Sequence, residues 1–197
     1  MEKKLLITGF DPFGGEKINP SWEAVKLLPE KIGAYRIYKM EIPTVFSVAA
    51  RQVLEQARKL QPDVILSVGQ AGGRSAVTPE RVAINLRDAS ICDNAGDKPQ
   101  EQPIVEGGPA AYFSTVPCKK MVEAMKQAGF PAAVSNSAGT FVCNDVLYSV
   151  LHHFNGTDLR AGFIHVPFLP SQGTPNMELM DIVKALTAAI EDLTAEE

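Results

Sequence analysis

Short apolar runs alternate with segments of helical period along nearly all of the 197 residues. Residues 4–8, 64–68 and 161–166 are apolar runs of the kind found in strands that are covered on both faces. The segment 46–60 carries its apolar residues on one helical face. Strands that alternate with helices favour a mainly parallel sheet with helices on both faces, so we expect an α/β fold.

The remaining segments continue this alternation. Ligands in such folds sit beyond the carboxyl ends of the strands, and Gly9, Gly69, Asn136 and His165 lie at or just past expected strand ends. We also expect long functional loops over 9–20, 69–79, 92–109 and 167–176. The other elements we expect are helices over 21–28 with Ser21 as N-cap, 117–128, 146–154 and 177–193, and strands over 36–42, 82–86 and 132–135.

Composition narrows the class of protein. Nineteen basic and 23 acidic side chains give a net charge of −4, which is a poor basis for binding nucleic acid. No apolar run is long enough for a transmembrane helix, and the first one is too short for a signal peptide. Three cysteines in a chain of this size favour free thiols in a reducing cytoplasm. We expect one domain over 1–197 and no membrane partner.

Cofactor and metal motifs are not matched. The glycine-rich segment 9–15 follows a strand, but no Lys-Ser or Lys-Thr pair follows its glycines as a phosphate loop requires. The segment 69–73 does not fit the dinucleotide fingerprint. No Cys or His pair has zinc-ligand spacing. We therefore expect no cofactor and no metal.

Cys143 is the best placed of the three thiols for chemistry. It lies in or beside the first turn of an expected helix that follows a strand, and a helix N-terminus favours a thiolate. Cys118 remains a candidate because it precedes two lysines near another helix start. Cys92 lies in an acidic loop that disfavours its thiolate. A buried structural role is the alternative for Cys143.

His165 is the histidine that could act as the base. It ends an expected strand, and a neighbouring strand could bring it beside the helix of Cys143. His152 and His153 lie further along that same helix, about 14 Å from the thiol, and are expected to be exposed. Spacing alone selects no carboxylate; Glu80 is attractive because it opens an alternating strand, but it could instead be a solvated partner of Arg81.

Several blocks of sequence together resemble the pyroglutamyl peptidase I (pyrrolidone-carboxylate peptidase) family of cysteine peptidases. The resemblance covers nearly the whole chain, and the order of the blocks makes it specific. The blocks are residues 9–15 (GFDPFGG), 19–21 (NPS), 69–74 (GQAGGR), 78–85 (TPERVAIN), 111–115 (AYFST), 135–144 (SNSAGTFVCN) and 163–167 (FIHVP).

The resemblance implies a cytosolic enzyme that removes N-terminal pyroglutamyl residues from peptides through a thioester. It implies Cys143 as nucleophile, His165 as general base and acid, and Glu80 as the residue that orients His165. It further implies a single three-layer α/β/α sandwich with a mainly parallel twisted sheet, assembled as a homotetramer without cofactor. The implied substrate contacts are Phe10, Phe13 and Phe141 around the flat ring, Asn19 and Gln70 at its edge, and Val142 beside the nucleophile.

One position departs from the family pattern. Ser90 stands where members commonly carry an arginine, and nearby Arg87 need not point the same way. Two other functions remain open from the residues alone: another hydrolase or transferase such as a nucleoside phosphorylase, which would need an anion-binding loop, and a non-catalytic binding protein on the same scaffold.

Overall fold

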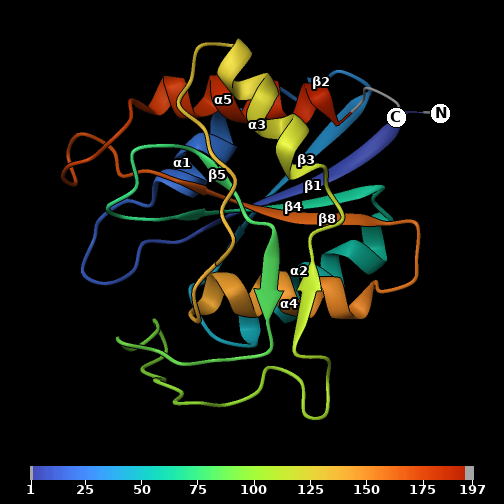
Figure 1. Cartoon of the computed structure of the whole chain (residues 1–197), viewed down its shortest axis with the longest axis vertical. Helices are drawn as coiled ribbons and strands as arrows, with labels where there is room; N and C mark the ends of the chain where they lie inside the picture. Colours follow the sequence, from blue (N-terminus) through green and yellow to red (C-terminus); the bar gives the residue numbers. More distant parts are fainter. Residues whose placement is uncertain (1, 194–197) are drawn as a thin grey trace.

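A six-stranded sheet runs through the middle of the structure, a computed structural model that describes residues 2–193 (Figure 1). Its middle four strands are parallel, and the short strand at each edge is antiparallel to its neighbour. In spatial order the strands are β2 (Lys31–Ile32), β3 (Tyr35–Ile42), β1 (Lys3–Phe10), β4 (Val64–Gln70), β8 (Arg160–Val166) and β5 (Thr78–Pro79).

Helices cover both faces of this sheet (Figure 1). One layer contains α1 (Pro20–Leu27), α3 (Cys118–Gln127) and α5 (Leu179–Asp192), and the other contains α2 (Val48–Leu60) and α4 (Val142–His153). A separate two-stranded antiparallel sheet of β6 (Val82–Ile84) and β7 (Ala111–Phe113) packs beside α4. The mainly parallel α/β sandwich expected from the sequence is confirmed.

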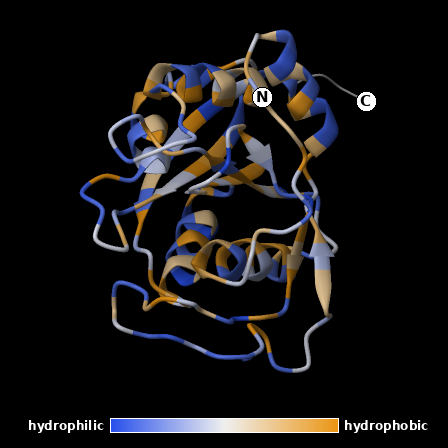
Figure 2. Ribbon diagram, turned by 60° about the vertical axis from the view of Figure 1, so that its left-hand side comes forward, coloured by the Kyte–Doolittle hydropathy of each residue, from blue (hydrophilic) through white to orange (hydrophobic). Residues whose placement is uncertain are grey.

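The sheet separates two apolar clusters, and the alternation of its strands supplies both. Leu5 and Ile7 of β1 belong to the cluster under α1, α3 and α5, whereas Leu6 and Phe10 belong to the cluster under α2 and α4. Successive side chains of a strand point to opposite faces, so one strand serves both layers. Figure 2 shows orange, apolar stretches along the central strands and alternating orange and blue bands around the helices.

The strand order places a topological switch between β1 and β4. From β1 the chain crosses to β3 on one side, and it then returns to β4 on the other. Open α/β sheets bind ligands at such a switch, beyond the carboxyl ends of the strands. Here those ends are Phe10 and Gln70, and the register of β4 with β8 sets Gly69 opposite His165.

Local structure differs from the sequence prediction in two places. Residues 132–135 form isolated bridges from Ala132 to Val77 and from Ser135 to Glu80 rather than a strand, so Asn136 follows no strand end. Asn19, not Ser21, caps α1. The Asn19 side chain accepts the Ser21 N–H at 3.1 Å, while Pro20 occupies the first turn, where its missing N–H costs nothing.

Other helix ends are shifted by one to four residues, the largest shift being the start of α4 at Val142 rather than at residue 146. The helix expected from residue 46 begins at Val48, because Ser47 has a φ of 61° and breaks the helical path. The expected strand 82–86 ends at Ile84. Within the long loop expected over 69–79, Gln70 still belongs to β4, and the strand β5 forms at the loop's far end.

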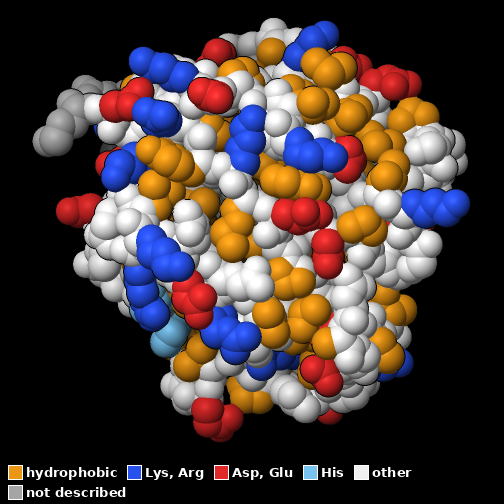
Figure 3. Space-filling view, turned by 180° about the vertical axis from the view of Figure 1, so that it is seen from behind, with side chains coloured by type: hydrophobic (Ala, Val, Ile, Leu, Met, Phe, Trp, Pro, Cys, Tyr) orange, Lys and Arg blue, Asp and Glu red, His pale blue; other side chains and the backbone are white. Residues whose placement is uncertain are grey.

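The surface carries charges of both signs. Lys and Arg side chains are interspersed with Asp and Glu across the face shown in Figure 3. None of the helices within residues 2–193 has the length and apolar character required to cross a membrane.

Candidate active site

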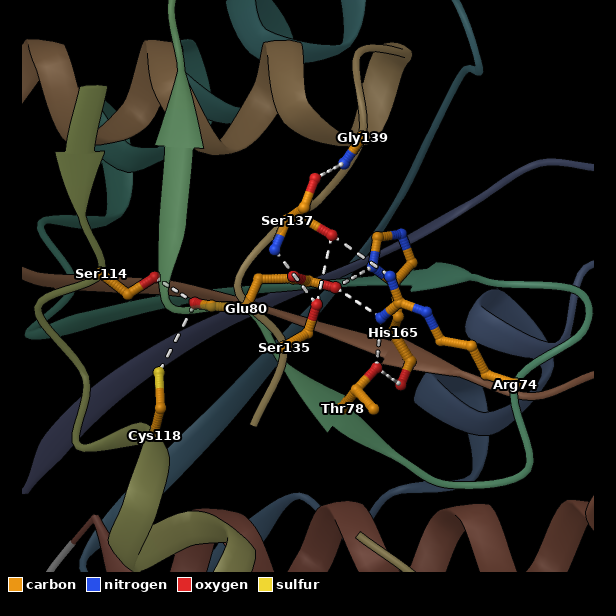
Figure 4. Close-up of polar contacts among 9 residues, drawn as sticks. All are labelled: Arg74, Thr78, Glu80, Ser114, Cys118, Ser135, Ser137, Gly139 and His165. Carbon is orange, nitrogen blue, oxygen red and sulfur yellow. Dashed lines mark hydrogen bonds and ion pairs between the residues drawn. The ribbon is translucent and has the colours of Figure 1, made fainter. Parts of the chain in front are cut away.

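Glu80 and His165 meet at the end of the sheet. Glu80 directly follows β5, which pairs with β8 so that Thr78 lies opposite His165. The His165 Nδ1 atom lies 2.7 Å from Glu80 Oε1, and both side chains are buried (Figure 4). Because an ionised carboxylate only accepts, Nδ1 carries the proton in the neutral ring, and Nε2 is left with a free lone pair.

Arg74 binds the same carboxylate oxygen. Its Nη1 lies 2.6 Å from Glu80 Oε1 and 2.6 Å from the Thr78 hydroxyl, and its Nη2 donates to the Ser137 carbonyl at 3.2 Å (Figure 4). Arg74 comes from the loop after β4 and reaches across the sheet end to Glu80, the residue that directly follows β5. The guanidinium therefore supplies the positive charge that a buried carboxylate needs.

The Cys143 sulfur lies over β4, next to this pair. A Cβ atom built on Gly69 would approach Cys143 Sγ to 2.9 Å and the Phe163 ring to 2.7 Å, so only glycine leaves room for the thiol. Gly69 is the register partner of His165, and neighbouring strands lie about 4.8 Å apart. The thiol, the imidazole and the carboxylate are thus brought together at the ends of β4, β8 and β5.

The pKa directions describe how protons are distributed in this cluster. Burial raises the pKa of Glu80, but the hydrogen bond and charge of His165, with the side chains of Ser135 and Arg74, outweigh it and hold that pKa below its ordinary value. Burial lowers the pKa of His165, and the Arg74 charge lowers it further, against the opposing effect of Glu80. Near neutral pH the pair is therefore a carboxylate and a neutral imidazole.

The Cys143 thiol is protonated in this environment. Burial, with a smaller contribution from the Glu80 charge, raises its pKa to about 12, and the charge of Arg74 and the residue's own N–H offset little of this. The thiolate that a helix N-terminus would favour is therefore not formed in advance here. A protonated thiol attacks only if a base takes its proton, and the neutral imidazole of His165 lies on the strand next to Gly69.

The first turn of α4 offers backbone donors next to the thiol. Val142 and Cys143 open the helix, and the N-cap residue Phe141 makes no side-chain hydrogen bond to it. The first N–H groups of a helix have no partner within the helix, and they attract negative charge. An oxyanion formed on a carbonyl attacked by the thiol would face such donors.

The aromatic residues expected around the ligand do not share one environment. Phe13 and Phe141 are half-buried with ring centroids 6.0 Å apart, and Phe46 packs edge-on to Phe141 at 5.2 Å. Phe10 is only 2% exposed and packs on Phe163 at 6.1 Å, which in turn lies 4.8 Å from His165. Phe13 and Phe141 thus offer ring surface to a ligand, while Phe10 lies beneath the site.

The two polar residues expected at the ligand edge also differ. Asn19 is buried, and its Oδ1 accepts from the Ser21 N–H and hydroxyl while its Nδ2 donates to the Asp11 carbonyl. Asn19 therefore shapes the loop after β1. Gln70 is half-buried at the end of β4, and its Oε1 accepts a bond of 2.9 Å from Gln172.

The other thiols lie apart from this cluster or behind it. Cys92 is exposed. Cys118 is buried, and its Sγ donates to the Glu80 carbonyl oxygen at 3.5 Å, behind the carboxylate (Figure 4). Burial raises the pKa of Cys118, which makes it a poor nucleophile despite its two lysine neighbours.

The remaining histidines lie on α4 away from its first turn. His153 is exposed, as expected. The prediction of exposure is wrong for His152, which is half-buried because its Nδ1 lies 2.9 Å from the Tyr112 hydroxyl and its ring stacks on Tyr148.

Arg87 does not take the place of the arginine missing at position 90. Its Nε and Nη2 lie 2.7 and 2.6 Å from Asp145 Oδ1. Asp145 is fully buried and also accepts the Ser47 N–H, so its carboxylate joins α4 both to Arg87 and to the start of α2. Ser90 itself is exposed.

Sequence reasoning missed the roles of Arg74 and Gln172. Arg74 stood at the end of a quoted motif, and its only local signal was a cation shortly before Thr78 and Glu80. Gln172 gave no signal, because its partner Gln70 lies 102 residues away. Within residues 2–193 no group of three or more His, Cys, Asp or Glu side chains is placed to hold a metal ion.

Comparisons with known proteins agree along the whole chain. The family model described as pyroglutamyl peptidase (Peptidase C15) matches residues 3–196. The pyrrolidone-carboxylate peptidase of Levilactobacillus brevis is 56% identical over 195 residues, which cover 95% of each chain. That of Clostridium perfringens is 54% identical over 194 residues, covering 95% of this chain and 91% of the relative.

Solved structures show the same similarity. Pyroglutamyl peptidase I from Bacillus amyloliquefaciens matches with a TM-score of 0.95 and 48% identity, covering 99% of this chain and 97% of that one. A mutant pyrrolidone carboxyl peptidase from Pyrococcus furiosus matches with a TM-score of 0.90 and 43% identity, covering 96% and 97%.

Proposed function

The chain belongs to the pyroglutamyl peptidase family, and on that premise we propose that it hydrolyses the amide bond after an N-terminal pyroglutamyl residue of peptides, with Cys143, His165 and Glu80 as its catalytic residues. One observation carries the assignment of residues. The His165 ring is held at 2.7 Å by the Glu80 carboxylate, and the Cys143 thiol rests on Gly69, the register partner of His165.

The first half of the reaction forms a thioester. Neutral His165 takes the thiol proton through Nε2 as the sulfur attacks the carbonyl carbon after the pyroglutamyl ring. The imidazolium that forms is stabilised by Glu80, which also fixes the ring tautomer. Backbone N–H groups at the start of α4 hold the oxyanion, and His165 then gives its proton to the leaving amine.

The second half releases pyroglutamate. A water molecule takes the place of the departed amine, and His165 again removes a proton as the water attacks the thioester carbonyl. Collapse of this intermediate breaks the carbon–sulfur bond, and the proton returns from His165 to Cys143.

Recognition of the ring divides between aromatic and polar groups. Phe13 and Phe141 flank the flat lactam, Val142 lies at its reacting end, and Gln70 meets the ring edge. Phe10 and Asn19 act mainly from beneath, by shaping the floor and the loop after β1. A site whose polar groups hydrogen-bond to the buried lactam rejects analogues that cannot form those bonds. Proline, which lacks the ring carbonyl, should therefore be a poor substrate.

The cellular setting follows from the family resemblance and the free thiols. We propose one catalytic domain over 1–197 that works in the cytoplasm, without a cofactor, as a homotetramer. Size-exclusion chromatography with light scattering tests the assembly, and an apparent mass of one 21.3 kDa chain would contradict it.

Release of a fluorophore from a pyroglutamyl amide tests the proposal. We expect Cys143→Ala and His165→Ala to abolish turnover, because each removes a group that reacts. Cys118→Ala is the matched control, since it removes the thiol that contacts the Glu80 carbonyl oxygen and should leave turnover largely intact. His152→Ala should also retain activity. Equal losses in Cys143→Ala and Cys118→Ala would overturn the assignment.

A further inference from the structure

The two carboxylate oxygens of Glu80 are not equally satisfied. Oε1 lies 2.7 Å from His165 Nδ1 and 2.6 Å from Arg74 Nη1. Oε2 is buried as well, yet it makes no hydrogen bond within residues 2–193. A buried carboxylate oxygen without a donor costs free energy, because burial removes the water that would otherwise solvate its charge. A hydroxyl close to Oε2 could supply that donor.

Ser135 carries the hydroxyl beside this carboxylate. Its backbone pairs with that of Glu80 in a parallel bridge, in which the Ser135 N–H donates to the Pro79 carbonyl at 2.9 Å. Register partners in paired strands send their side chains to the same face. Figure 4 accordingly shows the Ser135 hydroxyl beside the Glu80 carboxylate, and the Ser135 side chain helps to hold the pKa of Glu80 below its ordinary value.

In the structure the Ser135 hydroxyl is turned to Ser137. It donates to the Ser137 carbonyl at 3.2 Å and accepts the Ser137 N–H at 3.3 Å, and both distances are longer than usual for such bonds. The same carbonyl also receives Arg74 Nη2 at 3.2 Å, so it keeps a donor if the hydroxyl turns away. A hydroxyl proton rotates to suit its surroundings, and bonds to a charged acceptor are stronger than bonds to a neutral one.

We propose that Ser135 is a positioning residue, which donates its hydroxyl to Glu80 Oε2 during the reaction. With a donor on each oxygen, the Glu80 carboxylate stays ionised and its plane is fixed against the His165 ring. Ser135 thus acts through the His165–Glu80 pair rather than on the ligand. This inference rests on the proposed function, and it adds a residue that supports the proposed orientation of His165.

The acid limb of the kcat/KM profile reports on this hydrogen bond. Removing a donor from the carboxylate makes it hold protons more tightly, including the proton that it shares with His165. The limb should therefore move to higher pH when Ser135 loses its hydroxyl. Both thiols near Glu80 have a raised pKa, and an arginine keeps its charge, so these groups do not titrate on that limb. The ionisable side chains that interact with Glu80 are His165, Arg74, Cys143 and Cys118.

The test compares three variants by release of a fluorophore from a pyroglutamyl amide across a range of pH. Ser135→Ala removes the hydroxyl. Ser135→Thr keeps it, and a β-branched residue suits a bridge position. Ser114→Ala is the matched control, because the Ser114 hydroxyl donates to the backbone carbonyl of Glu80 at 2.6 Å instead of to its carboxylate (Figure 4).

We expect Ser135→Ala to lower kcat about tenfold, which corresponds to the loss of one hydrogen bond to a charged group. The KM should change little, because the lost bond acts on proton transfer rather than on ligand binding. The acid limb should move to higher pH in Ser135→Ala, return to the wild-type position in Ser135→Thr, and stay unchanged in Ser114→Ala. The position of this limb does not depend on how much of a variant is folded, so a purely structural role would not move it.

An unmoved acid limb in Ser135→Ala, or an equal shift in Ser114→Ala, would show that Ser135 does not serve the carboxylate. The same conclusion follows if Ser135→Thr keeps the shift of Ser135→Ala, since the hydroxyl would then not be its cause. Failure of the proposed function is separately visible, because the wild-type chain would then not release the fluorophore at all.

Discussion

A single carboxylate oxygen of Glu80 receives both His165 and Arg74, at 2.7 and 2.6 Å. The imidazole bond sets the ring tautomer, and the guanidinium keeps the carboxylate ionised while its charge disfavours protonation of His165. Arg74 thus acts on the proton balance of the site without occupying the position of a nucleophile or base.

Removal of Arg74 should change the pH dependence of the reaction. His165 must be neutral to accept the thiol proton, so kcat/KM falls as the pH drops through the pKa of His165. That pKa is lowered, so the fall begins below the ordinary histidine value of about 6.5. Arg74→Met removes a charge that lowers it, and we expect the acid limb of the kcat/KM profile to move to higher pH.

Arg81→Met is the matched control for this experiment. It removes a cation from the segment next to Glu80, but that cation does not contribute to the pKa shift of His165. Its acid limb should coincide with that of the wild type. An unchanged limb in Arg74→Met, or equal shifts in both variants, would contradict the role given to Arg74.

The high pKa of the Cys143 thiol further predicts that the kcat/KM profile shows no alkaline limb from this thiol below about pH 9.

The sequence indicated which residues belong to the candidate site more readily than it indicated their hydrogen-bond partners. Cys143, His165 and Glu80 could be named from motifs and family resemblance, and their catalytic roles stay predictions. The partners of Arg74 and Gln172 could not be named, because hydrogen bonds between distant segments depend on strand register and loop path. Asn19 shows the same limit, since its expected ligand contact and its helix cap use the same side-chain atoms.

At the scale of elements, the site depends on how α4 is seated on the sheet. The helix begins beside the carboxyl end of β4, and the absence of a side chain at Gly69 lets the Cys143 sulfur approach the strand. The Asp145 carboxylate, which is paired with Arg87, accepts the Ser47 N–H and so holds the same helix end to the start of α2. Two contacts of different kinds thus determine where the thiol lies.

Gly69→Ala should reduce kcat sharply. The new methyl group would stand 2.9 Å from Cys143 Sγ, and displacing a reacting atom by about 1 Å can cost roughly 100-fold in rate. Gly162→Ala is a matched control on β8, where the methyl group would meet Val116 at 2.2 Å instead. Fluorogenic turnover and urea denaturation are measured for both variants.

Both substitutions should lower stability, because both crowd a packed interior. Only Gly69→Ala should lose kcat in the folded protein. A Gly69→Ala variant with wild-type kcat would show that the sulfur does not react from its position over β4.

The sequence predicted the presence of helices and strands better than the residues at which they begin and end. The parallel sheet and its covering helices follow from apolar periodicity, which tertiary packing enforces. Helix starts depended on details such as the φ of Ser47 and the cap at Asn19. The apolar run 132–135 resembles a strand by composition, yet its backbone makes only isolated bridges to the β5 region. Strand propensity describes a short segment by itself, whereas a β-ladder also needs a partner segment of matching length.

At the scale of the whole molecule, the sheet joins the two apolar clusters into one structure. Strands β1, β4 and β8 send alternate side chains into both clusters. If either helical layer lost its packing, one face of these shared strands would be exposed. The same strands support the other layer, which would be weakened as a result. This arrangement favours cooperative unfolding of both layers.

We expect a single unfolding transition in urea at fixed protein concentration. The one tryptophan, Trp22, packs against the cluster under α1, α3 and α5, so its fluorescence reports on that layer. Far-UV circular dichroism reports on all helices, and the two midpoints should coincide.

Val53→Ala tests the same coupling from the opposite layer. Val53 is fully buried in α2, and its truncation should cost about 2 kcal/mol of unfolding free energy. The Trp22 fluorescence midpoint should fall together with the circular dichroism midpoint. Separate transitions, or a shift confined to circular dichroism, would show that the layers unfold independently.

Gly69 and Gln70 are consecutive residues of one strand, so their side-chain positions project to opposite faces of the sheet. The Gly69 position meets the Cys143 sulfur, whereas the Gln70 amide bonds to Gln172, which in turn contacts the Ile18 carbonyl. The last two residues of β4 thus seat the thiol on one side and join two distant loops on the other. A distortion of this strand end would therefore disturb the thiol and both loops together.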